Sequence, residues 1–99
     1  MDLPDFNEIE GFEWDAGNLE KNRKRHDVRS GEIEELFFNE PLIVKPDDFH
    51  SDVETRFMSL GVTNSGRKLF CVFTIRDKRI RPISARDMTS RERKAYDNS

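Results

Sequence analysis

The chain has 99 residues, of which 34% are hydrophobic and 37% charged, and its formal net charge is −3. This length predicts one domain over residues 1–99 with one modest core, in which ten aromatic residues would carry much of the packing. The single cysteine, Cys71, excludes an intrachain disulfide, and no apolar run is long enough for a membrane span or a signal peptide, so we expect a cytoplasmic protein.

Two helices are predicted in the first half of the chain. Residues 1–11 are acidic and are expected to fray, after which Asp15 is well placed to cap a helix over about 16–26. A second, shorter helix is expected to begin near Ser30. It should end before Pro41, because the residue before a proline avoids helical geometry.

Strands and a final helix are predicted in the second half. Pro82 lacks an amide donor and therefore predicts an edge strand or a bulge. Thr89 and Glu92 have the spacing of a capping box, which predicts a helix to about Tyr96. The strands are expected over residues 42–44, 54–62, 69–75 and 79–85. The sequence thus predicts an α+β fold, with N-terminal helices packed on a three- to four-stranded antiparallel sheet and a C-terminal helix.

Charge is distributed unevenly along the chain. Residues 65–99 contain ten Lys or Arg against four Asp or Glu, a local charge of +6 that leaves −9 for the rest. A positive region raises the local concentration of phosphate-rich partners. An ordinary solvated surface is the alternative, but several of these arginines lie within predicted strands, which favours a phosphate-binding face.

Metal chemistry and nucleophilic catalysis are poorly supported. Asp47, Asp48, His50 and Asp52 are close enough in sequence to share an ion, but their spacing matches no calcium loop. Neither histidine belongs to a triad signature, and Cys71 lies in an apolar run typical of packing. We expect no metal and no other cofactor.

Metal-free cleavage of RNA fits the residue types better. It requires a base for the ribose 2′-hydroxyl, cations for the phosphorane and an acid for the leaving oxygen. His26 is a candidate acid or base because histidine changes charge near neutral pH, although capping of the last helix carbonyls explains it equally well. Guanidinium groups suit phosphate, and the suggestive ones are Arg56, Arg76, Arg81 and Arg86, each of which has a cross-strand pair with an acid as its alternative.

Several segments together resemble the BrnT-type toxin family. The likeness begins with Phe12-Glu13-Trp14-Asp15, Asn22 and Arg25-His26-Asp27-Val28. It continues, in the family's order, with His50-Ser51, Arg56-Phe57, Leu60-Gly61, Gly66-Arg67, Arg81-Pro82-Ile83-Ser84-Ala85-Arg86, Glu92-Arg93 and Tyr96. The resemblance implies a RelE-like ribonuclease that blocks translation by cutting RNA. It also implies a hetero-oligomer with a BrnA-type antitoxin, which neutralises the toxin and supplies a DNA-binding element.

The resemblance also implies roles for individual residues. His26 would act as acid or base, and Arg56, Arg81 and Arg86 would bind the phosphate or the transition state. Further RNA contacts are expected from Lys24, Arg25, Arg76, Arg79, Arg93 and Tyr96, although packing is the favoured role for the Tyr96 ring. The chain departs from the family's pattern at Asn18, Asp27 and Pro82.

Two other functions are compatible with the same basic surface. A nucleic-acid-binding module without chemistry would bind phosphates through the same cations and leave RNA intact. An antitoxin-docking subunit of a repressor complex would use the positive face to hold an acidic or amphipathic protein.

Overall fold

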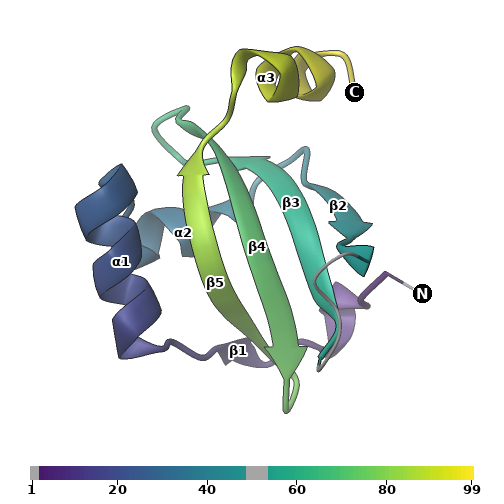
Figure 1. Ribbon diagram of the computed structural model, residues 1–99. Helices are drawn as coiled ribbons and strands as arrows, with labels where there is room; N and C mark the ends of the chain where they lie inside the picture. Colours follow the sequence, from purple (N-terminus) through teal and green to yellow (C-terminus); the bar gives the residue numbers. More distant parts are fainter. Residues whose placement is uncertain (1–2, 49–53) are drawn as a thin grey trace.

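The computed structural model describes residues 3–48 and 54–99. Within these ranges the chain forms one five-stranded sheet, three α-helices and a short 3-10 turn at Phe6–Glu8 (Figure 1). The elements, in chain order, are β1 (Gly11–Phe12), α1 (Ala16–His26), α2 (Ser30–Leu36), β2 (Ile43–Pro46), β3 (Arg56–Val62), β4 (Lys68–Arg76), β5 (Arg79–Asp87) and α3 (Ser90–Asp97).

The sheet is larger than predicted and it is mixed. Its strand order is β1-β5-β4-β3-β2, with antiparallel pairing throughout except between β1 and β5, which run parallel. The prediction of a three- to four-stranded antiparallel sheet missed β1, because two residues are too few to show an alternating pattern. The segment expected to fray also makes contacts, since the Phe6 ring lies 6.0 Å from that of Phe37.

Pro82 produces the predicted bulge. Val72 pairs with Ser84, whereas the next residue of β4, Phe73, pairs with Pro82, so β5 carries one extra residue, Ile83, at this point. Proline has no amide hydrogen for the ladder, and a bulge is a position that tolerates this loss.

α1 lies along the edge of β5 rather than over a face of the sheet (Figure 1). The Asp15 side chain accepts a hydrogen bond from the Asn18 amide at 3.0 Å and caps the helix as predicted. The buried side chain of Asn22 accepts a hydrogen bond from the Ala85 amide at 3.1 Å. This bond satisfies a main-chain donor of β5 beyond the reach of β1.

α2 covers one face of the sheet. It begins at Ser30, as predicted, and its N-cap is Arg29. A side chain at Gly61 would meet the Leu36 Cβ at 3.2 Å, so this glycine permits the helix to approach β3 closely. The core between α2 and the sheet consists of Val28, Ile33, Leu36, Phe57, Leu69, Cys71, Phe73, Ile80 and Ala85.

Aromatic rings dominate the centre of this core, as the composition predicted. The Phe73 ring stacks on Phe57 at 5.4 Å and meets Phe37 edge-on at 5.0 Å. Cys71 is fully buried beside them, and burial raises the pKa of its thiol to about 12. The thiol is therefore unreactive, which confirms the packing role.

No helix of the described residues covers the other face of the sheet, and α3 lies across one end of it (Figure 1). The capping box of α3 forms as predicted, with the Thr89 side chain accepting from the Glu92 amide and the Glu92 carboxylate from the Thr89 amide. Tyr96 is buried and its hydroxyl donates to the Pro41 carbonyl, which fastens α3 to the segment before β2.

Candidate functional site

The uncovered side of the sheet carries most of the predicted arginines. Pairing register and strand alternation place one set of side chains on it, which we call the open face. Its middle is apolar and its cations lie toward its margins. The open face consists of Ile43, Lys45, Arg56, Met58, Leu60, Val62, Lys68, Phe70, Val72, Thr74, Arg76, Arg79, Arg81, Ser84 and Arg86.

One group of cations lies near the start of β5. Arg56, Thr74 and Arg81 are successive partners across β3, β4 and β5, so the two arginines flank one threonine. The Arg81 Nη2 lies 3.2 Å from the Asp15 Oδ2. The hydrogen bond from the Asn18 amide and the charge of Arg81 lower the pKa of Asp15.

The neighbouring Arg76 and Arg79 differ from each other. The Arg76 Nη2 lies 3.1 Å from the Glu54 Oε2. Arg76 is thus paired with an acid, which was the alternative to phosphate binding. Arg79 is exposed and forms no ion pair with any residue in the ranges 3–48 and 54–99. Both residues extend the positive end of the open face beyond Arg56 and Arg81.

The second group surrounds Arg86, near the end of β5. Its Nη1 and Nη2 bond to both carboxylate oxygens of Glu92, at 2.7 and 3.1 Å, and its guanidinium carbon lies 4.2 Å from the centre of the Phe70 ring. The bond from Arg86 is the main cause that lowers the pKa of Glu92. A planar cation is thereby held flat between a carboxylate and an aromatic ring.

A groove with a volume of about 310 Å³ runs between the sheet and α3 next to Arg86. Its walls are mainly apolar, and two charged side chains, Lys45 and Glu92, contribute to them. The remaining lining residues are Ile43, Met58, Ser59, Leu60, Phe70 and Ala95.

The two groups of arginines share a face but do not form one pocket. Arg81 and Arg86 are five positions apart on β5, which corresponds to about 15 Å along an extended strand. A single phosphate cannot bridge this distance, so the open face suits an extended anionic ligand. Most of these arginines also hold a carboxylate, which is the alternative that the sequence left open for each of them.

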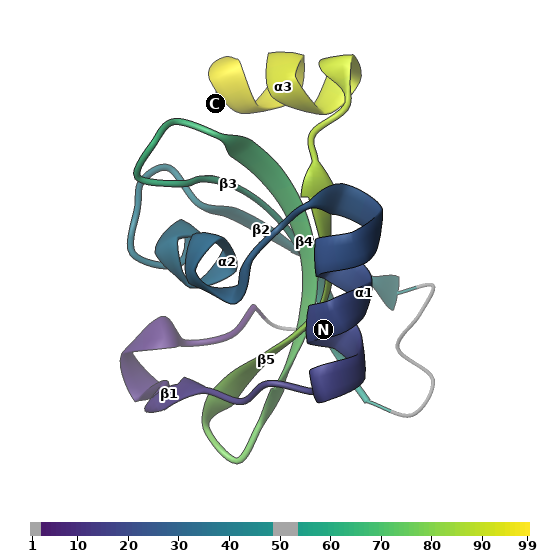
Figure 2. The ribbon, with the colours of Figure 1, turned by 90° about the vertical axis from the view of Figure 1, so that its left-hand side faces the viewer.

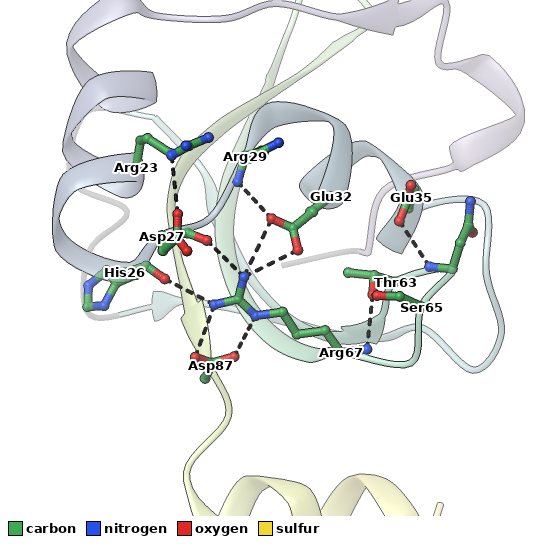
Figure 3. A network of polar contacts seen from close by, with 11 residues as sticks. Arg23, His26, Asp27, Arg29, Glu32, Glu35, Thr63, Ser65, Arg67 and Asp87 are labelled. Atoms are coloured by element: carbon green, nitrogen blue, oxygen red, sulfur yellow. Dashed lines mark hydrogen bonds and ion pairs between the residues drawn. The ribbon is translucent and has the colours of Figure 1, made fainter.

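His26 lies away from the open face. A depression on the side of α1 that faces α2 is lined by Leu19, Arg23, Val28 and Ser30. Helical spacing places His26 on the same side of α1 as Leu19. Its side chain is exposed at the last turn of the helix and extends away from the neighbouring polar network (Figure 3).

The other predicted residues of α1 and α3 are exposed or packed. The Lys24 Nζ lies 2.8 Å from the Glu20 Oε1, an ordinary pair on one helix face, and Arg25 is exposed beside it. Arg93 is exposed on α3. Tyr96 has no ring surface to offer a base, because it is buried and its hydroxyl is bonded to Pro41, so we leave it out of the proposed site.

The residue that the sequence analysis missed is Arg67, in the turn between β3 and β4 (Figure 3). Its Nε and Nη2 bond to both carboxylate oxygens of Asp87, at 2.8 and 3.1 Å, and its Nη1 lies 3.2 Å from the Glu32 Oε2. It also donates to the main-chain carbonyls of His26 at 3.0 Å and Asp27 at 2.8 Å. Arg67 therefore joins the end of α1, the start of α2 and the end of β5.

The charges in this network reinforce one another. The hydrogen bonds with Arg67 are the largest cause that lowers the pKa of Asp87, and the same bonds raise the pKa of the guanidinium. The carbonyls at the end of α1 carry partial negative charge, which a cation offsets. Gly66-Arg67 was visible as a motif, but the partners of Arg67 lie 20 to 41 residues away, so no local pattern indicated them.

Asp27, one of the three departures from the family's pattern, occupies the left-handed C-cap of α1 with φ of 50°. Glycine is the usual residue in this conformation, and aspartate is among the few others that adopt it readily. The side chain pairs with Arg23 at 3.2 Å, so the helix ends normally despite the substitution.

Neither a metal centre nor a membrane span is found among the described residues. No group of three or more His, Cys, Asp or Glu within residues 3–48 and 54–99 could hold a metal ion. Of the loop considered above, His50 and Asp52 lie outside the described residues, as does Ser51 of the His50-Ser51 motif. The helices that the structure describes are too short and too polar to cross a bilayer.

Comparison with known proteins identifies the family. The model of a family described as the ribonuclease toxin BrnT of type II toxin-antitoxin systems matches residues 14–92. The chain belongs to this BrnT family. This confirms the resemblance seen in the sequence, and it places the chain among toxins that are described as ribonucleases.

A solved structure supports the fold independently. The crystal structure of the ribonuclease toxin BrnT from Brucella abortus aligns with a TM-score of 0.58 and 18% sequence identity, over 81% of this chain and 97% of that chain. At this identity the likeness concerns the fold alone. No curated protein matches the sequence.

Proposed function

We propose that the chain is a metal-independent endoribonuclease toxin with a RelE-like fold, which acts in the cytoplasm and stops translation by cutting RNA. Its antitoxin would be of the BrnA type and would supply the DNA-binding element of a hetero-oligomer. The observation that carries the proposal is the arginine-bearing open face in a chain of a ribonuclease toxin family.

An RNA strand that crosses the open face would meet both groups of arginines. The ion pairs of Arg81 and Arg86 are partly exposed, so a phosphate, which fits the guanidinium fork as a carboxylate does, can reach the two arginines and replace the carboxylates. The distance of about 15 Å between the two groups suits a strand of several nucleotides. An unpaired base can stack in the groove against Phe70.

Two groups can carry the proton. His26 remains our candidate acid or base, provided that the strand passes over the end of β5 toward α1. Glu92 is a second candidate for the base, because its carboxylate lines the groove and lies against Arg86. If Arg86 turns to the phosphate, the Glu92 carboxylate is free to accept the 2′-hydroxyl proton.

The experiment is an RNA cleavage assay with purified protein in EDTA. Wild type, His26→Ala, Glu92→Gln, Arg81→Ala and Arg86→Ala are compared, with Arg91→Ala as a matched control because Arg91 is exposed on α3 and lies outside the open face. We expect cleavage by wild type and the control, and strong loss in the Arg81 and Arg86 variants. Loss of wild-type cleavage in EDTA would contradict metal independence.

Toxicity is tested by induced expression with and without the antitoxin. Growth arrest that the antitoxin relieves is the expected result. Comparison of total RNA from cells that express wild type or His26→Ala then links arrest to cleavage and tests one residue in the same experiment.

A specific observation supports a second candidate, a non-catalytic nucleic-acid-binding or antitoxin-docking subunit of a repressor complex. The arginines are paired with acids around an apolar centre that contains Met58 and Phe70, and such a surface also suits a protein. Salt-sensitive RNA binding without cleavage, at every salt concentration tried, would favour this candidate.

A further inference from the structure

A second surface, on the other side of the sheet, exposes aromatic rings. Phe38 follows α2 and its exposed fraction is 79%, the largest among the large apolar residues that the structure describes, and that of Phe6 is 37%. Their rings belong to one cluster, since Phe12 lies 6.2 Å from Phe38 and 5.7 Å from Phe37, and Phe37 lies 6.0 Å from Phe6. We call these four residues the aromatic patch.

The aromatic patch encloses a cavity of about 300 Å³, whose walls also include Ile9, Glu10, Gly11 and Ile80. A single exposed apolar side chain is ordinary, but a cluster of rings around a hollow marks an interaction site. The core does not require the Phe38 ring, because Phe37, the adjacent residue, already meets Phe73 at 5.0 Å. Packing within the chain therefore leaves the exposure of Phe38 unexplained.

The charge around the aromatic patch is mainly negative, although the main chains of Lys78 and Arg79 pair with Glu10 and Gly11 at one edge of it. Glu10 lines the cavity, Glu8 is exposed in the same segment, and Glu40 is exposed two residues after Phe38. The first 64 residues carry a net −9, whereas the open face carries the arginines. An RNA phosphate would be repelled here, so the complementary ligand is a basic segment of a protein.

We infer that the aromatic patch is the surface on which the antitoxin anchors. The partner of stated chemistry is an antitoxin segment that inserts an aliphatic or aromatic side chain beside Phe38, with Lys or Arg on either side of it. A type II toxin has a protein antitoxin, and charge complementarity selects this side of the molecule for it. A basic side chain over the exposed Phe38 ring adds a cation–π contact.

The location of the aromatic patch separates anchoring from inhibition. α2 and the segment before α1 lie on one side of the sheet, away from the open face (Figure 2). The anchor can therefore hold the antitoxin without touching the arginines, and another part of the antitoxin must cover them. The inference rests on the family's antitoxin and holds whether or not this chain cleaves RNA.

The test measures binding of the purified cognate antitoxin by isothermal titration calorimetry. Phe38→Ser removes the exposed ring, and Glu10→Lys reverses the charge of the cavity wall. Leu3→Ser is the matched control, because Leu3 is 56% exposed but does not line the cavity. Circular dichroism shows that each variant is folded, and an RNA cleavage assay shows whether the open face is intact.

We expect Phe38→Ser to weaken antitoxin binding at least tenfold and Glu10→Lys to weaken it severalfold, the latter effect shrinking at high salt. Leu3→Ser should bind as wild type does. If wild type cleaves RNA, Phe38→Ser should cleave it at the same rate. The antitoxin should no longer inhibit this cleavage fully.

Three results would overturn the inference. Wild-type affinity in both Phe38→Ser and Glu10→Lys would show that the antitoxin docks elsewhere. Loss of antitoxin binding in Arg81→Ala or Arg86→Ala, with binding retained in Phe38→Ser and Glu10→Lys, would move the anchor to the open face. A dimer of the free chain in analytical ultracentrifugation that Phe38→Ser dissociates would assign the aromatic patch to a second copy of the chain.

Discussion

Arg67 and Arg86 are similar in exposure and differ in how many groups they hold. Their side chains are 26% and 35% exposed, and each forms a bidentate pair with one carboxylate. Arg67 also binds Glu32 and two main-chain carbonyls, which come from parts of the chain far apart in sequence. Arg86 holds a carboxylate six residues away, the carbonyl of the next residue and the face of the Phe70 ring on the neighbouring strand. We therefore expect the number and origin of the partners, more than the ion pair itself, to distinguish an arginine that maintains the fold from one that is available to a ligand.

The largest effect should come from the open face. Removing one preorganised donor from a developing oxyanion costs about 2.7–4 kcal/mol, so Arg86→Ala and Arg81→Ala should each lower the rate of RNA cleavage roughly 100- to 1,000-fold. The free energy of unfolding should fall by only about 1 kcal/mol for Arg81→Ala, which loses partly exposed pairs, and by somewhat more for Arg86→Ala, which also loses its contact with the Phe70 ring. Single-turnover cleavage and urea denaturation measure the two quantities. Wild-type cleavage by both variants would remove the open face from the mechanism.

Arg67→Ala should have the opposite profile, with a large effect on stability. The substitution leaves the carbonyls at the end of α1 and the Glu32 and Asp87 carboxylates without their cation, which should cost about 2 kcal/mol. For a chain of this size the melting temperature would fall roughly 8–16 °C. Arg67→Lys should recover little, because an ammonium group cannot reproduce the planar fork.

The control for this prediction is Arg91→Ala, which removes an exposed arginine from α3 and should leave the melting temperature unchanged. Calorimetry of the three variants makes the measurement. If Arg67→Ala has the melting temperature of wild type but has lost RNA cleavage, Arg67 belongs to the site. The distinction drawn from the number of partners is then wrong.

The contrast between these two arginines also explains what could be predicted from the sequence. The sequence pattern predicted a strand over 54–62, and the structure has β3 there, with Phe57 and Ser59 buried on one side and Met58 and Leu60 on the other. The caps at Asp15 and Thr89 and the bulge at Pro82 are local features and were also predicted. Local spacing is sufficient wherever the partners are close in sequence.

Features that depend on distant partners could not be predicted. The role of Arg67 requires knowing that His26, Glu32 and Asp87 meet, and β1 becomes a strand only because β5 lies beside it. The side of α1 on which His26 lies depends on how the helix packs against the sheet edge. The assignment of individual residues to the site therefore stays a prediction, although the family itself is shown.

Glu92→Gln sharpens the comparison with an intermediate effect. The substitution removes the carboxylate that holds Arg86 and weakens the capping box of α3, at a cost of about 0.5–1 kcal/mol of stability. If Glu92 only holds Arg86, cleavage should be retained or faster, because the guanidinium is free for phosphate. If Glu92 is the base, cleavage should fall about 100-fold or more at pH values where histidine is neutral. A pH–rate profile of Glu92→Gln beside His26→Ala separates the two roles.

The smallest effect concerns acid. The pKa of Asp87 and that of Glu92 are lowered from their ordinary values of 3.8 and 4.5, chiefly by hydrogen bonds from Arg67 and Arg86 respectively. As the pH falls, the two carboxylates therefore take up protons in the unfolded chain before they do so in the folded chain. Their contribution to stability is fully present above the ordinary pKa values and is lost as the pH falls through the pKa values of the folded state. Urea midpoints measured from about pH 6 to about pH 3 should fall for wild type. The urea midpoint should fall less steeply with pH for Arg67→Ala, because Asp87 has lost the partner that lowers its pKa. If the midpoints of the two proteins fall equally steeply, the Arg67 network does not stabilise the ionised carboxylate.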